Sequence, residues 1–387
     1  MHPEMEQIRC AIVRGGTSKG IFLRANDLPA DPARRDAVIL AVFGSPDIRQ
    51  IDGLGGADVL TSKLAIIGPS SKADCDVDYT FGQVSFEKAF IDYKGNCGNI
   101  SSAVGGFAID EGMVRAVEPV TTVRIHLTNS GSVLTAEVPV KDGKARISGD
   151  FAIDGCPGTG ARVTLDWSGV AGGITGKLLP TGKAKDVFHI DGREYPVSLV
   201  DAGNPLVFIH AASLGMKGTE SPAEIEGDAA LMAVIEKIRG KAAVLCGLTD
   251  APENAALQSP YNPFFAIVSP PADYTAINGK KVRAGDADLV SRLLFMLKMH
   301  KAYPITGTVC TGAACRIPGS VAWEALGERG KQARTILIGH PSGVIPVEAE
   351  AREAPDEPGG VAVTRLGVYR TARRIMDGYV YVPKASC

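Results

Sequence analysis

Short strand-like segments, separated by turn residues, run through the whole sequence and rarely alternate with helical segments. The chain has 45 glycines and 24 prolines, a composition that favours many tight turns. Two-residue hairpin turns are predicted at Lys141-Asp-Gly-Lys144 and Ile190-Asp-Gly-Arg193. Because a doubly wound parallel sheet needs regular alternation of strands and helices, this pattern predicts the α+β class instead.

The predicted strands share β-branched and aromatic residues bounded by Gly, Pro, Asn or Asp. They are Ile8–Val13, Val77–Phe86, Phe90–Tyr93, Thr122–Thr128, Val133–Val140, Arg162–Asp166, Val197–Leu199, Leu206–His210, Phe264–Ser269 and Tyr379–Val382. The predicted helices share a 3.6-residue apolar period. They are Arg34–Phe43, Ile100–Glu111, Pro222–Arg239, Asp286–His300 and Val321–Leu326.

Both halves of the chain follow one plan, in which a glycine-rich turn and several strands precede an apolar helix introduced by a cysteine. The first helix is predicted to follow Asn96-Cys97-Gly98-Asn99, and the second to follow Val309-Cys310-Thr311-Gly312. A chain of 387 residues is also long for one core. With a boundary near Leu179-Pro-Thr-Gly-Lys183, we predict two domains of duplicated architecture, residues 1–183 and 184–387.

Charge and cysteine usage narrow the class of protein further. The net charge of −2 gives no broad basic field for nucleic acid or an anionic membrane. No apolar run approaches the roughly 18 residues of a membrane span, and the start of the chain resembles no export signal. Eight cysteines without any CxxC pair, and six scattered histidines, favour reduced thiols in the cytoplasm over disulfides or zinc.

Cys97 is the strongest candidate for chemistry. A polar, glycine-containing turn leads into a helix of small residues, with Asn99 as its predicted N-cap. A thiol at the mouth of a helix ionises more readily, because free N–H groups and the helix dipole stabilise the anion. The alternative is that Cys97 only fills space in the core, as free cysteines often do. Its Gly and Asn neighbours favour a turn that faces a ligand.

Two glycine turns each lead to the triplet Thr-Ser-Lys. Arg14-Gly-Gly-Thr-Ser-Lys-Gly20 lacks the spacing of a phosphate loop, but its N–H groups, hydroxyls and Lys19 suit an anion. Asp52-Gly-Leu-Gly-Gly56 precedes Thr61, Ser62 and Lys63, and a desolvated Lys63 could serve as a base. The alternatives are solvated turns and a surface lysine. Two later turns, around Asn204 and at His340-Pro-Ser-Gly343, are equally open between turn chemistry and carboxylate binding.

The ordered set of these motifs resembles the methylaconitate isomerase family. That family includes 2-methylaconitate cis–trans isomerase, 3-methylitaconate Δ-isomerase and 4-oxalomesaconate tautomerase. The likeness runs from about Ile8 to the C-terminus, and Val77–Val84 and Ile153–Val163 look closest to the methylitaconate branch. The resemblance implies a diaminopimelate-epimerase-like fold, with two similar domains that each wrap a strand layer around a central helix, and an active site in the cleft between them.

The resemblance also implies roles for particular residues. Family members use a lysine and a cysteine as an acid/base pair, which map onto Lys63 and Cys97. The predicted substrate-binding residues are Thr17, Ser18, Lys19, Thr61, Ser62, Asn96, Gly98, Asn99, Asn204, Cys310, Thr311, Gly312, Ser342 and Gly343. Cys310 departs from the epimerase pattern, since no glycine follows it directly. A mechanism with two equivalent thiols is therefore in doubt, and packing or binding is left open for Cys310.

The predicted activity is a cofactor-independent isomerase that moves a proton in an unsaturated di- or tricarboxylate. No metal, flavin or nicotinamide motif is present in the sequence. Two other classes stay open: a carboxylate-binding accessory protein to an aconitase-type enzyme, and a thiol redox protein using Cys310 and Cys315. The sequence leaves the exact acid and the oligomeric state, including a homo-oligomer, undetermined.

Overall fold

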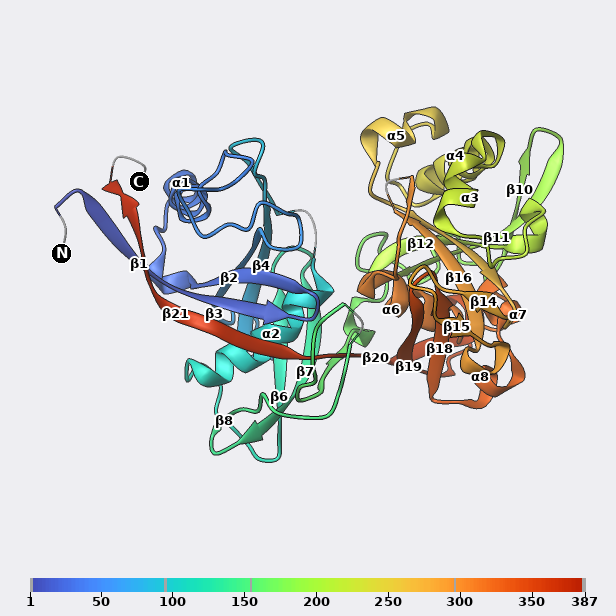
Figure 1. Ribbon diagram of the computed structural model, residues 1–387. Helices are drawn as coiled ribbons and strands as arrows, with labels where there is room; N and C mark the ends of the chain where they lie inside the picture. Colours follow the sequence, from blue (N-terminus) through green and yellow to red (C-terminus); the bar gives the residue numbers. More distant parts are fainter. Residues whose placement is uncertain (1–2, 94–95, 154, 296, 385–387) are drawn as a thin grey trace. The chain divides into compact units, whose positions relative to one another are not determined.

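A computed structural model describes residues 3–93, 96–153, 155–295 and 297–384 of the protein (Figure 1). The chain forms two compact units, each with its own core. Unit 1 consists of Met1–Asp166 and Tyr369–Cys387, and unit 2 consists of Trp167–Val368.

This division differs from the predicted boundary between residues 183 and 184. The C-terminal strand β21 (Ala372–Pro383) returns to unit 1, where it pairs along β1 (Met5–Gly15). Residues 167–183 fall in unit 2 because their backbone is bonded to β11 (Arg193–Ala202): the N–H of Gly172 donates to Asp201 O, and the N–H of Asp201 donates to Leu178 O. Neither long-range pairing leaves a local signal in the sequence.

Unit 1 is a curved strand layer around the helix α2 (Gly98–Asp110), which contacts strands on several sides (Figure 1). The strands are paired in the order β21-β1-β2-β3-β4-β6-β7-β9. The remaining elements are β2 (Ser18–Arg24), α1 (Pro32–Phe43), β3 (Lys63–Pro69), β4 (Val77–Val84), β5 (Ile91–Asp92), β6 (Val120–Leu127), β7 (Ser132–Lys141), β8 (Lys144–Ala145) and β9 (Val163–Asp166).

Strand alternation decides which side chains of β2 and β3 meet α2. Ile21 and Leu23 join the core under α1, whereas the ring of Phe22 lies 5.3 Å from the ring of Phe107 in α2. Ser18 and Gly20 therefore lie on the α2 side with Phe22. Lys63 pairs directly with Gly20 in the parallel β2–β3 ladder, so it shares that side.

Unit 2 has the same plan around the helix α6 (Ile305–Ala314). Its strands are paired in the order β10-β11-β12-β13-β16-β18-β19-β20. The strands and helices are β10 (Asp186–Ile190), β12 (Asn204–His210), α3 (Pro222–Gly227), α4 (Ala229–Leu245), α5 (Ala255–Gln258), β13 (Phe264–Ser269), β14 (Tyr274–Thr275), β15 (Lys281–Val282), β16 (Leu289–Phe295), β17 (Lys298–Met299), α7 (Val321–Ala325), α8 (Glu328–Gln332), β18 (Thr335–His340), β19 (Gly343–Glu353) and β20 (Val361–Arg370).

The strand layers of the two units match pairing by pairing. Along the two orders given above, the third and fifth pairings are parallel and the other five are antiparallel in both units. In each unit the central helix follows a short strand, β5 or β17, and precedes an antiparallel pair, β6–β7 or β18–β19. The predicted duplication, a strand layer around a central helix in each half, is confirmed.

Most local predictions are also confirmed, and three differ. The predicted helix Asp286–His300 is wrong, because Leu289–Phe295 forms strand β16, buried between β13 and β18. An apolar run of this length suits a buried strand or a helix, and sheet pairing decides here. The predicted helix Pro222–Arg239 is divided at Asp228, whose side chain caps the start of α4. The second central helix begins at Ile305 rather than after Gly312.

Candidate active site

The β1–β2 turn of unit 1 packs against the first turn of α2, and two glycines make this approach feasible. A Cβ atom at Gly15 would lie 2.5 Å from the backbone oxygen of Asn99, and one at Gly16 would lie 2.2 Å from its Oδ1. The backbone of Gly16 also has φ +52, a conformation that residues other than glycine rarely adopt. The glycines predicted as an anion turn therefore place Thr17 beside the helix start.

Asn99 joins the turn to the helix but does not cap it. The helix begins at Gly98 and its N-cap is Cys97, which makes no side-chain capping bond, so the predicted N-cap role of Asn99 is wrong. Instead Asn99 Oδ1 accepts from the Thr17 N–H at 3.4 Å and from Arg370 Nε at 3.1 Å. Because the N-cap side chain makes no bond to the first turn of α2, the N–H groups and dipole of that turn are available to stabilise an anion.

Cys97 is partly exposed at this helix start and has two notable neighbours. Burial raises the pKa of Tyr79, and the nearby Cys97 acts in the same direction. Burial lowers the pKa of Arg370 to about 10, and the nearby Cys97 opposes that shift. Arg370 therefore remains a cation at neutral pH.

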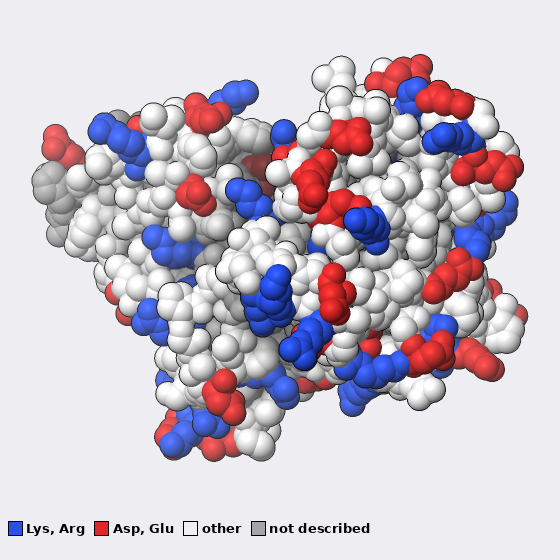
Figure 2. Space-filling view, turned by 45° about the vertical axis from the view of Figure 1, so that its right-hand side comes forward, with Lys and Arg blue, Asp and Glu red and all other residues white. Residues whose placement is uncertain are grey.

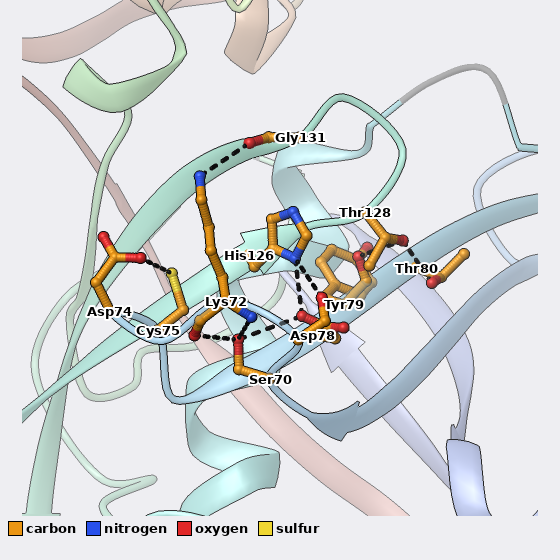
Figure 3. A network of polar contacts seen from close by, with 11 residues as sticks. Ser70, Lys72, Asp74, Cys75, Asp78, Tyr79, Thr80, His126, Thr128 and Gly131 are labelled. Carbon is orange, nitrogen blue, oxygen red and sulfur yellow. Dashed lines mark hydrogen bonds and ion pairs between the residues drawn. The ribbon is translucent and has the colours of Figure 1, made fainter.

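Cys75 is a useful contrast, because it is also partly exposed but lies in a closed polar network (Figure 3). Its Sγ donates to Asp74 Oδ1 at 3.8 Å, while the neighbouring Asp78 accepts from His126 and Ser70. Burial and Asp74 both raise the pKa of Cys75. The network therefore fastens the loop before β4 to β6 and disfavours a thiolate at Cys75.

Lys63 is held in place on the α2 side of the sheet. It is 8% exposed, and its Nζ donates to Gln83 Oε1 at 3.0 Å and lies 5.5 Å from the ring centre of Phe81. Gln83 is fixed in turn, because its Nε2 donates to Ser62 O at 3.0 Å. No salt bridge involving Lys63 is found among the described residues, so its amine faces an amide rather than a carboxylate.

Gly20 shows that Lys63 and the start of α2 converge. A Cβ atom at Gly20 would lie 2.9 Å from Lys63 O and 3.1 Å from Ile100 Cδ1. The backbone of Lys63 and the first turn of α2, which are far apart in the sequence, therefore both lie beside Gly20.

The other residues predicted around the first Thr-Ser-Lys triplet divide between the two faces of β2. Ser18 is 2% exposed, and its hydroxyl on the α2 side has no hydrogen-bond partner among the described residues. Lys19 pairs with Arg14 and lies on the opposite face, away from α2. The Ser18 hydroxyl thus lies on the α2 side of the sheet, whereas the Lys19 side chain does not.

In the second Thr-Ser-Lys triplet, the two residues before Lys63 are hydrogen-bonded within the fold. Ser62 is fully buried and its Oγ donates to Gln50 Oε1 at 2.6 Å, while Thr61 Oγ1 donates to Asp58 O at 3.4 Å. The side chain of Asn96 donates to Ser130 Oγ at 3.3 Å. These bonds order the loops on either side of the site, and the predicted substrate contacts of Thr61, Ser62 and Asn96 would compete with them.

In unit 2, two of the predicted residues lie near the start of α6. Asn204 Nδ2 donates to Thr306 Oγ1 at 2.8 Å in the first turn of the helix. Ser342 Oγ donates to the backbone oxygen of Lys301 in the segment that leads into α6, and Gly343 O accepts from the Tyr274 hydroxyl at 2.6 Å. Asn204 therefore contacts the first turn of α6, and Ser342 contacts the segment before it.

Cys310, Thr311 and Gly312 are not at a helix mouth, so the predicted binding role does not fit their positions. All three are buried in the interior of α6. Cys310 Sγ donates to Val200 O at 3.2 Å, Thr311 shares a 2.9 Å hydrogen bond with the Tyr303 hydroxyl, and a Cβ atom at Gly312 would lie 3.0 Å from Val347. Burial also raises the pKa of Cys310 well above its ordinary value, and that of Cys315 to about 12, which disfavours redox chemistry at this pair.

Two residues of the site were missed by the sequence reasoning. Arg370 contacts Asn99 from near the far end of the chain, and Gln83 contacts Lys63 from the neighbouring strand. Gln83 lies in a segment predicted as a strand, so a correct β3–β4 register would have found it. Arg370 has no comparable local signal.

The surface agrees with the even charge balance of the sequence. In the view of Figure 2, acidic and basic side chains are interspersed over the face rather than gathered by sign. Among the described residues, no helix is long and apolar enough to cross a bilayer.

Comparison with known proteins identifies the family. The model of the PrpF protein family matches residues 5–383, and the chain belongs to that family. It is 53% identical to a 3-methylitaconate isomerase of Eubacterium barkeri over 98% of both chains. It is 41% identical to a 2-methyl-aconitate isomerase of Shewanella oneidensis over 99% of both chains. A crystal structure of methylitaconate-delta-isomerase, also 53% identical, superimposes with a TM-score of 0.94 over 99% of this chain and 97% of the other. The predicted family and fold are confirmed.

Proposed function

We propose that this protein is a cofactor-independent isomerase that catalyses a 1,3-proton shift in an unsaturated di- or tricarboxylate, with Cys97 and Lys63 as the proton-transfer groups. Methylitaconate is the first substrate to test, and methylaconitate and 4-oxalomesaconate are the next, since curated relatives carry all three activities in their names. The free state of the described cysteines supports a reducing compartment, and we place the enzyme in the cytoplasm.

One observation supports the proposal: the buried Lys63 and the first turn of α2, which follows the partly exposed Cys97, both lie beside Gly20. One group would remove a proton from the allylic carbon of the substrate. The electron pair left behind spreads through the double bond into the conjugated carboxylate as a dienolate. The other group would then deliver a proton to the far end of the allylic system, and the double bond moves.

The uncapped start of α2 supplies the electrostatic part of this chemistry. Its N–H groups and dipole favour a carboxylate bound near Cys97. The unpartnered Ser18 hydroxyl adds a donor on the same side of the sheet. These fixed dipoles do not have to reorient during the reaction, which is how preorganised sites lower a barrier.

The test is exchange in deuterated water. Purified protein is mixed separately with methylitaconate, methylaconitate and 4-oxalomesaconate, and proton NMR follows the allylic and vinylic signals. We expect one acid to isomerise, with deuterium entering at the newly protonated carbon because a separate donor group exchanges with solvent. If no acid exchanges although each protects Cys97 from iodoacetamide, the protein binds carboxylates without catalysis.

A further inference from the structure

Arg370 is placed where the chain returns from unit 2 to unit 1, and its guanidinium reaches the start of α2. Nε donates to Asn99 Oδ1 at 3.1 Å, and Nη1 donates to the backbone oxygen of Tyr369 at 2.8 Å. Nη2 makes no hydrogen bond to any described residue. Nη2 and the second N–H of Nη1 are therefore left for another acceptor.

Four other shielded arginines of the chain are satisfied within the fold. Arg374 bonds Glu111 at 2.9 Å, Arg365 bonds Glu348 at 2.9 Å, and Arg239 bonds Glu236 at 2.6 Å. Arg316 instead donates to several backbone oxygens. Arg370 differs from all four, because it has no carboxylate partner and its Nη2 makes no hydrogen bond among the described residues. A partly buried cation without a counter-ion is costly unless a ligand supplies the missing charge.

The surroundings of Arg370 are held rigidly. The next residue, Thr371, accepts at its backbone oxygen from the Gly16 N–H and from Arg14 Nη1, both at 2.9 Å. Arg14 Nη1 also donates to Gly16 O. The returning strand therefore fixes Arg370 and the glycine turn together, next to Asn99 and Cys97. Such a fixed guanidinium fork is well suited to a planar carboxylate.

We propose that Arg370 binds a carboxylate of the substrate through Nη1 and Nη2, beside Cys97. The inference rests on the proposed function for the identity of the ligand, and it names the residue that recognises one of its carboxylates. Arg370 supplies the positive charge that the sequence motifs assigned to Lys19, which lies on the other face of β2.

The test compares Arg370→Met and Arg370→Lys with the control Arg374→Met, which removes a shielded arginine that already has a carboxylate partner. The measurements are kcat and KM for the accepted acid, and the inhibition constant of tricarballylate, a saturated tricarboxylate that cannot isomerise. For Arg370→Met we expect KM and the inhibition constant to rise together by about 10- to 100-fold, the size expected for lost charged hydrogen bonds. Arg370→Lys should restore part of the loss, and Arg374→Met should change neither constant.

An unchanged inhibition constant of tricarballylate in a folded Arg370→Met protein would overturn the inference, even if kcat falls. Should Arg370→Met not fold, an unchanged inhibition constant in Arg370→Lys would count against the inference in the same way, because the single ammonium cannot reproduce the guanidinium fork.

A separate assay applies if the proposed function fails. If the wild type isomerises no acid, protection of Cys97 from iodoacetamide by tricarballylate still reports on the site. Loss of that protection in the Arg370 variants, but not in Arg374→Met, supports the inference, and equal protection in all proteins contradicts it.

Discussion

The two units share one architecture but differ at the positions where unit 1 carries reactive groups. Cys97 is the N-cap of α2, and the N-cap of α6 is Pro304. Lys63 is the first residue of β3 and pairs with the third residue of β2. At the equivalent place, Phe264 is the first residue of β13 and pairs with the third residue of β12. The duplicated scaffold therefore carries a thiol and an amine in one copy only.

The partner of Lys63 is replaced as well. Gln83 lies opposite Lys63 on β4, and continuing the β13–β16 register places Phe295 opposite Phe264. The rings of Phe264 and Phe295 lie 5.2 Å apart in an edge-to-face arrangement. A hydrogen-bonded amine and amide in unit 1 thus correspond to an aromatic pair in unit 2. The comparison shows that both units provide the same backbone position. Only the side chains in unit 1 can transfer a proton there.

The largest expected effect separates the two cysteines. Cys97→Ser should lower kcat by about 10²- to 10⁴-fold, the usual contribution of general acid–base catalysis, because a hydroxyl ionises far less readily than a thiol. The matched change Cys310→Ala, in the interior of α6, should leave kcat close to that of the wild type and lower the melting temperature. Steady-state kinetics and thermal unfolding check both. Near-normal turnover by a folded Cys97→Ser protein would remove the thiol from the mechanism.

Lys63→Met should also lower kcat, by about 10²-fold or more, because one of the two proton-transfer groups is lost. This loss should be somewhat smaller than that of Cys97→Ser. The equivalent change in unit 2, Phe264→Leu, should reduce stability by about 1 kcal/mol without affecting kcat. Lys19→Met should stay close to the wild type, because its side chain lies on the other face of β2. A stronger loss in Lys19→Met than in Lys63→Met would mean that the roles of the two lysines are exchanged.

Gln83→Glu tests the neutral surroundings of Lys63. A carboxylate 3.0 Å from the amine would stabilise the ammonium form and oppose proton removal by the neutral amine. We expect kcat to fall by about 10-fold, with the activity recovering as the pH is raised. Gln83→Leu removes the hydrogen bond without adding charge, and it should not reproduce this pH dependence. The same pH profile in both variants would show that the charge at this position is unimportant.

The smallest effect is expected at Asn204 in unit 2. Asn204→Ala removes the 2.8 Å hydrogen bond to Thr306 in the first turn of α6, so it should lower the melting temperature slightly and leave kcat and KM unchanged. Thr306→Val removes the same bond from its other side and serves as the comparison. If either change lowered kcat as strongly as Lys63→Met, the chemistry would not be confined to the residues of unit 1.

Much of the protein was predictable because its signals are local. The hairpin turn at Lys141–Lys144 depends on Asp142 and Gly143, both of which have positive φ in the structure, as a two-residue turn requires. The helix α2 could be predicted from its apolar period and its polar start. The family motifs around Cys97 and Lys63 lie in short segments, so one sequence was enough to name them and the class of reaction.

Tertiary structure decided what depends on pairing between distant segments. Leu289–Phe295 is a strand because β13 and β18 bond it on both sides, and its composition would allow a helix equally well. β21 belongs to unit 1 because of its pairing with β1, and Arg370 reaches Asn99, 271 residues earlier, through the same return of the chain. Turn chemistry and helix periodicity act over a few neighbouring residues, so they are encoded locally. The register of a sheet and the position of a charged side chain such as Arg370 depend on which distant segment pairs with which. Only the folded chain determines that pairing.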